Sequence, residues 1–477
     1  MDAQLLAELT KLLGSDNVLH KPEELLLYEY DGSADVARPN CVVFPQNTEH
    51  VVALVALANR FNTPIVGRGA GTGLSGGALA RMGGILIVFS RMNKILQIDA
   101  ENQRSVVQPG VVNSDLSAAV AHLGLHFAPD PSSQKACTIG GNVSENSGGP
   151  HTLAYGVTTN HVVAMQVVLP TGELVRIGNS AVDASGYDLM GLFVGSEGTL
   201  GLVTEITVKL TRLPEETKTL LAIFDRVEDA TETVAELTAR GITPAACEML
   251  DGWSLRAIEA YIHAGYPTDS AAVLLIDVDG LREAALAQSE QVGEVCHSHH
   301  AREVRAAKDS RERDLLWKGR KNAFAAVGRI SPSYYVQDGV IPRTKLPATL
   351  RRIEEIGKKY GFEIGNIFHA GDGNLHPIVP FDPRNAAEFR RAVAASDEII
   401  EYCVAAGGTI TGEHGVGMEK DRLMPLMFSD AELELMKRVR NAFNPTGLLN
   451  PEKIFPSAKG CGEIRSRPRA SDEVSVA

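Results

Sequence analysis

A glycine-dense stretch at residues 63–80, TPIVGRGAGTGLSGGALA, constrains the fold of this chain most. Gly71, Gly73 and Gly76 have the spacing of a dinucleotide-binding Rossmann turn, which needs a strand before it and a crossover helix after it. The strand is present, but ILIVF at 85–89 predicts a new strand within about ten residues, which leaves no room for that helix. No Gly-Lys-Ser/Thr follows, so a P-loop is excluded as well.

The remaining interpretation is a loop whose successive N–H groups form an anion-binding concavity, with Arg68 as an additional cation. A second stretch, 129–156, is also rich in glycine and small polar residues, and two such loops suit a pyrophosphate. The alternative is a flexible surface loop. The apolar residues Leu74 and Leu79 disfavour that alternative for the first stretch.

Size and charge narrow the class of protein. A chain of 477 residues exceeds one hydrophobic core, so two or three domains are expected. The net charge of −13 disfavours nucleic acid or an anionic membrane as the main partner. No apolar run approaches the ~20 residues of a transmembrane helix, and the N-terminus does not resemble a signal peptide. The six cysteines are scattered without a C-x-x-C, which predicts a cytoplasmic protein without a disulfide framework or an iron–sulfur cluster of its own.

Hydrophobic periodicity predicts helices within residues 1–30 and short strands separated by long loops from 41 to 210. The composition changes near residue 213, where strand-like and helix-like segments begin to alternate in a way that suits a β-α-β-β-α-β unit. Further helices are predicted at 343–360 and 387–406.

Residues 365–377, GNIFHAGDGNLHP, predict a metal-binding hairpin. Asp372-Gly373 is a type I′ turn signal, and such a turn would place His369 directly opposite His376. Opposed residues have Cβ atoms about 4.5–5.5 Å apart, close enough for both imidazoles to bind one ion. The alternative is a loop in which the two histidines are merely hydrogen-bonded.

A glycine-bounded segment at 407–417, GGTITGEHGVG, holds Glu413 and His414 in a predicted tight turn. Glu413 could complete a His₂Glu set with His369 and His376, leaving coordination positions open for substrate. Zinc and manganese fit equally. The alternative for Glu413 and His414 is a capped helix end.

Three motifs resemble the FAD-binding domain of the vanillyl-alcohol oxidase and p-cresol methylhydroxylase (PCMH) superfamily: PIVGRGAGTGLSGG, CTIGGNVSENSGGPHTLAYGVTTNHV and GSEGTLGLVTEITVKL. FHAGDGNLHP, GEHGVG and NPTGLLNPEKIFP resemble its bacterial 2-hydroxyacid dehydrogenase branch, and residues 317–343 are most similar to the flavin-bearing subunits of glycolate oxidases. The resemblance implies an α+β fold: a two-subdomain PCMH-type FAD-binding domain, a ferredoxin-like α+β cap domain for substrate, and a C-terminal helical segment.

The domains expected on this basis are 1–213 for FAD, 214–406 for the cap with its metal hairpin, and 407–457 for a segment returning to the flavin, followed by a disordered tail at 458–477. The resemblance implies a non-covalent FAD, since residues 67–77 contain no histidine or cysteine, although His151 and Cys137 leave a covalent link open. The residues that would contact FAD are Arg68, Gly69, Ala70, Gly71, Thr72, Gly73, Leu74, Ser75, Pro129, Asp130, Thr138, Gly140, Gly141, Asn142, Ser144, Ser147, Gly148, Gly149, Gly156, Glu197, Gly201, Val203 and Asn450.

The resemblance further implies that a 2-hydroxy acid chelates the divalent ion, that His414 removes the hydroxyl proton, and that hydride passes to the flavin. Arg320 would hold the substrate carboxylate, with Lys321, Tyr334, Tyr335 and Gln337 as weaker pocket candidates.

Relatives that oxidise 2-hydroxyglutarate carry a lysine where this chain has Val336, so glycolate is expected first and D-lactate second, with D-2-hydroxyglutarate as the alternative. The implied electron acceptor is an iron–sulfur partner subunit or a quinone, with the protein held near the inner membrane through its partners. A nicotinamide-dependent dehydrogenase and a non-catalytic flavin- or metal-binding partner subunit are the competing functions.

Overall fold

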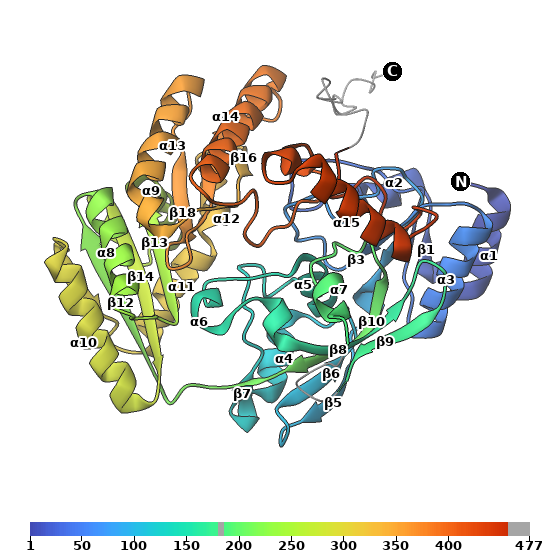
Figure 1. The fold of residues 1–477 in the computed structure, drawn as a ribbon, viewed down its shortest axis with the longest axis horizontal. Helices are drawn as coiled ribbons and strands as arrows, with labels where there is room; N and C mark the ends of the chain where they lie inside the picture. The colour runs from blue at the N-terminus through green and yellow to red at the C-terminus, as the bar shows by residue number, and fades with distance from the viewer. Residues whose placement is uncertain (180–185, 457–477) are drawn as a thin grey trace, which may run out of the picture.

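The computed structural model describes residues 1–179 and 186–456, so the tail predicted at 458–477 lies outside the described residues. Figure 1 shows two lobes, one coloured blue to cyan and the other yellow-green to orange, with the red C-terminal segment over the first. Mixed helix and sheet content agrees with the predicted α+β class. Within the described residues no helix combines the length and hydropathy of a membrane span.

The first sheet carries the glycine-dense loop at one end. Its order is β1 (Val18–Leu19), β2 (Cys41–Val43), β4 (Ile85–Val88) and β3 (Ile65–Arg68), and β2, β4 and β3 run parallel. Helices α1 (Ala3–Leu13) and α3 (Thr48–Arg60) pack on it through buried leucines and valines. Residues 69–84, all of them described, join the parallel strands β3 and β4 without a helix, which confirms that this is no Rossmann crossover.

A second, antiparallel sheet has the order β5 (Ile95–Asp99), β6 (Arg104–Val107), β10 (Leu202–Lys209), β8 (Val162–Val168) and β9 (Leu174–Gly178). The stretch at 129–156, which the sequence predicts to be a loop, instead contains α5 (Ile139–Glu145) and α6 (Thr152–Tyr155). Thr138 caps α5 by accepting a hydrogen bond from the Gly141 N–H at 3.2 Å, and Ile139 and Val143 bury its apolar face.

The second lobe is built on one large antiparallel sheet. Its order is β15 (Glu303–Ala306), β12 (Glu216–Phe224), β14 (Ala272–Gly280), β13 (Ala246–Asp251), β18 (Gly365–His369), β19 (Asn374–Leu375) and β17 (Gly339–Val340). β16 (Ser333–Val336) and β20 (Pro377–Phe381) pair beside β18. The first four strands, with α8 (Val227–Ala239) and α10 (Arg282–Ser298), form the predicted β-α-β-β-α-β unit, and α9 (Gly252–Ile262) is inserted between β13 and β14.

Helices cover both faces of this sheet. Leu220 and Phe224 of β12 point to the side of α8, α10, α13 (Leu346–Tyr360) and α14 (Ala386–Ala405). Leu221 and Ile223 alternate with them and pack against α9, α11 (Ser310–Lys321) and α12 (Ala323–Val327). The helices predicted at 343–360 and 387–406 are confirmed as α13 and α14.

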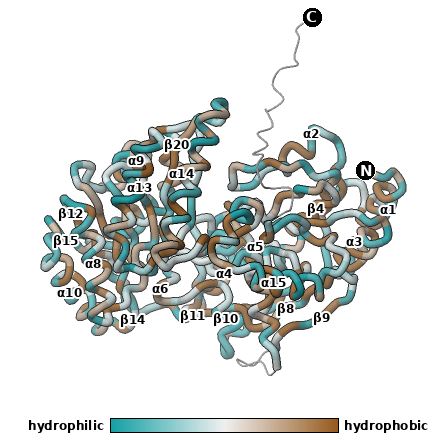
Figure 2. Tube along the Cα trace, turned by 45° about the horizontal axis from the view of Figure 1, so that its top comes forward, coloured by the Kyte–Doolittle hydropathy of each residue, from teal (hydrophilic) through white to brown (hydrophobic). Residues whose placement is uncertain are grey.

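The C-terminal segment joins the first lobe. Helix α15 (Asp430–Phe443) lies over that lobe in both Figure 1 and Figure 2, and the rings of Phe193 and Phe443 meet edge to face at 5.2 Å. The Ile65 N–H then donates to the Leu448 carbonyl at 2.9 Å, and the Asn450 N–H donates to the Ile65 carbonyl at 2.8 Å. These bonds attach the end of the described chain to the edge of β3.

Candidate active site

The histidine hairpin differs in register from our prediction. His369 pairs with Asn374, and His376 lies between β19 and β20 rather than opposite His369. Within residues 370–373 only Gly373 has a positive φ (80°), whereas a type I′ turn needs two, so the connection is a four-residue loop. Asp372 accepts a hydrogen bond from the Asn374 N–H at 3.0 Å and so shapes this loop.

The two imidazoles nevertheless converge. Their ring centroids are 5.1 Å apart, and Glu413 Oε1 lies 3.0 Å from His369 Nε2 and 3.1 Å from His376 Nε2. The three ligand atoms all lie within 4.8 Å of one another. Ligands of one zinc ion are typically about 3.3 Å apart, so the predicted His₂Glu set fits a divalent ion with little movement.

A buried carboxylate fixes the orientation of His369. Glu248 Oε1 lies 2.7 Å from His369 Nδ1, so that nitrogen carries a hydrogen and Nε2 is turned toward Glu413, where an ion would take the place of a proton on Nε2. Burial disfavours the charged form of both groups. The attraction of Glu248 nevertheless raises the pKa of His369 well above its usual value. Arg320 and, to a lesser extent, His369 lower the pKa of Glu248. Sequence reasoning missed Glu248, although a glutamate inside the apolar strand ACEMLD was a usable signal.

Arg320 has a different partner from the one we predicted. Its side chain is 1% exposed, does not line the cavity described below, and places Nη2 2.5 Å from Glu248 Oε2. In this structure the guanidinium neutralises the buried Glu248, behind the cluster of His369, His376 and Glu413, and contact of Arg320 with a substrate carboxylate stays a prediction. Nε and Nη1 of Arg320 have no hydrogen-bond partner among the described residues.

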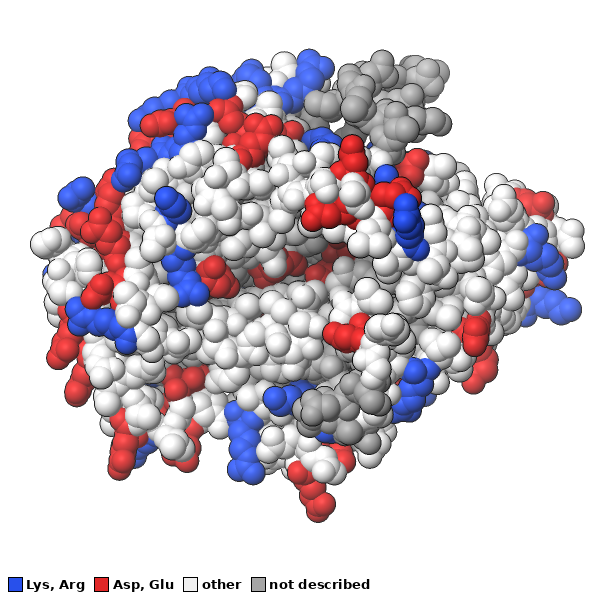
Figure 3. Space-filling model, in the orientation of Figure 1, with Lys and Arg blue, Asp and Glu red and all other residues white. Residues whose placement is uncertain are grey.

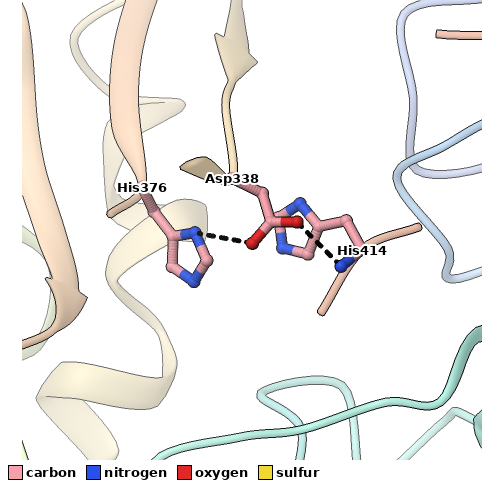
Figure 4. Close-up of side chains that lie close together, drawn as sticks. All are labelled: Asp338, His376 and His414. Carbon is pink, nitrogen blue, oxygen red and sulfur yellow. Dashed lines mark hydrogen bonds and ion pairs between the residues drawn. The ribbon is translucent and has the colours of Figure 1, made fainter. Parts of the chain in front are cut away.

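A second buried carboxylate, Asp338, shapes the loop that carries Glu413 and His414. Its Oδ2 accepts hydrogen bonds from the N–H groups of Gly412 and His414, each at 2.9 Å, and from the Thr411 hydroxyl at 2.5 Å. Figure 4 shows the Asp338 carboxylate directed toward the ring of His376 and the backbone N–H of His414. Asp338, His376 and His414 could also surround an ion. Because Oδ2 of Asp338 already accepts these hydrogen bonds, the set of His369, His376 and Glu413 is the better ligand group.

The His414 ring stacks on the His376 ring, with centroids 4.9 Å apart and an interplanar angle of 9°. Burial lowers the pKa of His414 to about 4, against the opposing attraction of Asp338. The imidazole is therefore neutral near pH 7, and its Nδ1 has no hydrogen-bond partner among the described residues. A neutral, unpartnered imidazole beside a metal site can accept a proton.

A cavity of about 420 Å³ joins this site to the glycine loops, and Figure 3 shows a hollow across the molecule with acidic side chains in its floor. His376, Glu413 and His414 line it, together with Lys321, Tyr334 and Val336. Of the residues predicted to contact FAD, the following line the cavity: Arg68, Gly69, Ala70, Gly71, Thr72, Gly73, Leu74, Thr138, Gly140, Gly141, Asn142, Ser144, Ser147, Glu197, Gly201 and Val203.

The other residues predicted to contact FAD do not line the cavity: Ser75, Pro129, Asp130, Gly148, Gly149, Gly156 and Asn450. Two of them, Asn450 and Ser75, hold the lining segments in place. Asn450 donates to the carbonyls of Gly77 and Glu197 at 3.0 and 2.6 Å, and the Ser75 carbonyl accepts from Met418.

Asp130 is one of the residues outside the cavity lining, because its carboxylate is paired elsewhere. Its Oδ2 lies 2.9 Å from His151 Nδ1 and 3.1 Å from Lys321 Nζ.

The glycine loop fits a dinucleotide cofactor. Arg68 is 6% exposed and folds beneath Gly71, where the Cβ of any other residue would collide with the guanidinium. Gly71 and Gly76 have φ values of 72° and 74°, which favour glycine. Arg68 Nη1 has no hydrogen-bond partner among the described residues, so a buried cation remains available to an anionic group in the cavity.

Sequence reasoning also missed Glu145 and Phe324, both of which line the cavity, and Asp338. Asp338 stands directly before Gly339 in VQDG, and Glu145 lies within the quoted motif, but neither position has a periodicity that marks it as functional. Their importance comes from contacts with residues far away in the chain.

Comparisons with known proteins agree with this geometry. A model of the FAD binding domain matches residues 39–178, and a model of the FAD linked oxidases, C-terminal domain, matches residues 213–454. The chain is 48% identical over 448 residues to the glycolate oxidase subunit GlcD of Escherichia coli strain K12, covering 94% of this chain and 90% of the relative. It is 41% identical over 450 residues to the Bacillus subtilis subunit of the same name, covering 94% and 96%.

More distant relatives share the fold. A D-lactate dehydrogenase of Anaerostipes hadrus is 35% identical over 427 residues, covering 88% of this chain and 90% of the relative. The solved structure of p-cresol methylhydroxylase superposes with a TM-score of 0.81 at 18% identity, covering 94% of this chain and 96% of that one. The predicted PCMH-type FAD-binding fold is thereby confirmed. The protein belongs to the family of FAD-linked oxidases.

Proposed function

We propose that the protein oxidises a small 2-hydroxy acid to the 2-oxo acid, with glycolate as the first candidate and D-lactate as the second. The observation that carries this proposal is the shared cavity, in which His376, Glu413 and His414 lie at one end and the glycine loops at the other. Three of the relatives reported above are named for glycolate or D-lactate, which supports the same substrate class.

Each part of the chain has a role in this chemistry. Bound FAD supplies a hydride acceptor, and a divalent ion, zinc or manganese, supplies a Lewis acid. His369, His376 and Glu413 hold the ion, and Glu248 orients His369 for that purpose. His414 accepts the hydroxyl proton at a ring nitrogen, for which its lowered pKa keeps it deprotonated near neutral pH.

The walls of the cavity favour a small monocarboxylate. Phe324 stacks on Tyr334 with centroids 6.3 Å apart and lies 6.4 Å from the ring of His376. Both aromatic residues line the cavity with Val336, so a second carboxylate would meet an apolar wall and lose its hydration without a partner. Lys321 is the cation that faces the cavity near this wall, and it is the candidate to attract the substrate carboxylate.

The electrons leave through another protein. The described cysteines at 41, 137, 247, 296 and 403 are buried and dispersed, which suits a chain that relies on an iron–sulfur partner subunit or a quinone. The Escherichia coli relative is itself named as a subunit, which supports assembly with partner chains, and we propose that this assembly lies in the cytoplasm, held next to the inner membrane by those partners. We propose that FAD is non-covalent. His151 pairs with Asp130 away from the cavity lining, and Cys137, which does line the cavity, is a poor nucleophile because burial raises the pKa of its thiol.

Anaerobic reduction of the purified flavoprotein tests this function. We expect glycolate to bleach the flavin spectrum fastest, D-lactate to follow, and L-lactate and D-2-hydroxyglutarate to act poorly. Removal of the metal by chelation should stop bleaching, and zinc or manganese should restore it. Unchanged bleaching in fully demetallated protein would show that the ion has no role in oxidation, and absence of bleaching with every acid would exclude the proposed function.

A further inference from the structure

Glu145, the last residue of α5, has an unusual environment at the wall of the FAD cavity. Its Oε1 accepts a hydrogen bond from the Ser75 hydroxyl at 3.4 Å. Its Oε2 is inaccessible to solvent and has no hydrogen-bond partner among the described residues. A buried carboxylate with an unpaired oxygen is costly, and such a group normally serves a ligand or carries a proton.

Glycines from two distant segments make room for this side chain. A Cβ on Gly77, in the glycine-dense loop, would collide with Glu145 Oε1, and a Cβ on Gly415, two residues after Glu413, would collide with Oε2. Gly73 approaches Oε1 as well, at 4.0 Å from where its Cβ would stand. The carboxyl group of Glu145 therefore fills the place where the cofactor loop meets the loop that carries Glu413.

A second carboxylate lies beside it. Glu197 accepts hydrogen bonds from the N–H groups of Val416 and Gly417, both at 2.7 Å, and these donors favour its charged form. Its Oε1 lies 3.0 Å from the Cβ position of Gly415, the same point that Glu145 Oε2 crowds. Two adjacent buried carboxyl groups do not both ionise, and Glu145, which lacks N–H donors, is the one that keeps a proton.

The other charged groups near Glu145 do not reverse this assignment. Asp31 adds a further negative charge, and Lys453 opposes it, but the Lys453 ammonium donates to the Leu79 carbonyl at 2.7 Å. Burial and the charge of Glu197 raise the pKa of Glu145 well above its usual value.

We propose that Glu145 binds FAD as a neutral carboxylic acid whose O–H donates a hydrogen bond to an oxygen of the cofactor. The proton lets an acidic residue line a cavity that receives a pyrophosphate, where a carboxylate would repel it. This inference concerns cofactor binding and holds whichever acid is oxidised.

The experiment measures FAD dissociation from the holoenzyme by the recovery of FAD fluorescence on dilution, for wild type, Glu145→Gln and Glu145→Leu. Glutamine keeps a neutral donor of the same shape, so E145Q should bind FAD within a few-fold of wild type. Leucine removes the donor, so E145L should raise the Kd of FAD by about 10- to 100-fold. Thermal unfolding of each apoprotein verifies that the variants are folded.

A pH series adds an independent readout. Above the raised pKa of Glu145, the Kd of wild type should rise by up to about tenfold per pH unit, while E145Q stays flat. Asp31→Asn, which keeps Glu145 but removes a negative charge that helps to raise its pKa, should keep the wild-type slope and begin it at a lower pH.

Three results would overturn the proposal. E145L binding FAD as tightly as wild type would show that Glu145 makes no contact with the cofactor, and E145Q binding as weakly as E145L would show that the ionised form is required. An equal loss of affinity with pH in wild type and E145Q would assign the effect to another group, such as Lys453.

Discussion

Gly148 and Glu413 approach each other so closely that a Cβ on Gly148 would stand 2.8 Å from Glu413 Oε2. Gly148 belongs to the first lobe, in the motif that resembles an FAD-binding loop, and Glu413 is the proposed metal ligand of the C-terminal segment. The loop of Gly148 and the proposed metal ligand Glu413 are therefore in direct contact, so a substitution in that loop can move the Glu413 carboxylate.

Gly148→Ala should displace the Glu413 carboxylate, because the added methyl group would stand 2.8 Å from Glu413 Oε2. Gly148 has an ordinary φ, so the substitution does not strain the backbone. We expect metal affinity and turnover to fall by about 10- to 100-fold while FAD remains bound. Metal content by mass spectrometry and the flavin absorbance measure the two effects. Gly293→Ala, where a Cβ meets nothing within 4 Å, is the control. Full metal content in G148A would contradict the prediction.

His414→Ala should remove the proton acceptor without disturbing either bound group. We expect kcat to fall by about 10²- to 10⁴-fold, with FAD and metal content unchanged. Stopped-flow measurement of flavin bleaching gives the rate of the oxidation step directly. A variant that bleaches at the wild-type rate would favour the reading of this chain as a non-catalytic partner subunit.

Glu248→Gln should destabilise the second lobe, because it leaves Arg320 buried without its counter-charge. Removing one partner of a buried ion pair costs about 3–5 kcal/mol in the free energy of unfolding. Urea unfolding measures this loss. Glu354→Gln breaks an exposed pair with Lys358 on α13 and should cost less than about 1 kcal/mol. Equal losses in the two variants would show that the buried pair has no special importance.

Val336→Lys should widen the range of substrates, since the new ammonium would reach into the apolar wall of the cavity. We expect kcat/KM for D-2-hydroxyglutarate relative to glycolate to rise by about 10- to 100-fold, the value of one charge-assisted hydrogen bond. Val336→Met supplies similar length without charge. If methionine gives the same gain, size rather than charge sets the preference.

The pair between His151 and Asp130 predicts a pH-dependent contribution to stability. Burial opposes a charged ring, but Asp130 and Asp277 raise the pKa of His151 to about 10. Because the unfolded value is about 6.5, the stabilisation is fully present below about pH 6.5 and is lost as the pH rises towards 10. The difference in Tm between wild type and His151→Gln should therefore shrink over that window. His20→Gln, at an exposed position, should show no such trend.

The hairpin histidines and Arg320 show which features of the site the sequence could not predict. The two hairpin histidines were expected to converge and do, but through a four-residue loop and a different register, because hairpin signals in a sequence do not fix loop length. Arg320 was expected to hold a substrate carboxylate, and its ion pair with Glu248 was not foreseen. Glu248 is also 121 residues from His369, with which it forms a hydrogen bond. Contacts between residues so far apart in the chain depend on the packing of whole elements, which local patterns do not encode.

The helices and strands were predicted more completely, since the continuous apolar run of β12 and the apolar spacing of α13 are properties of single elements. The short helices α5 and α6 were taken for loop because their glycine-rich sequences have low helix propensity. Capping by Thr138 and the burial of Ile139 and Val143 compensate for that propensity.

The hydrogen bonds between Ile65 and the segment at 448–450 have a consequence for biosynthesis. Asn450 also clamps the carbonyls of Gly77 and Glu197, so the wall of the cofactor cavity includes bonds to nearly the last described residues. On the ribosome, the first lobe emerges long before this closing segment does. The nascent chain can therefore complete this wall of the flavin cavity only after residue 450 has left the ribosome, so the first lobe alone does not form the whole FAD site.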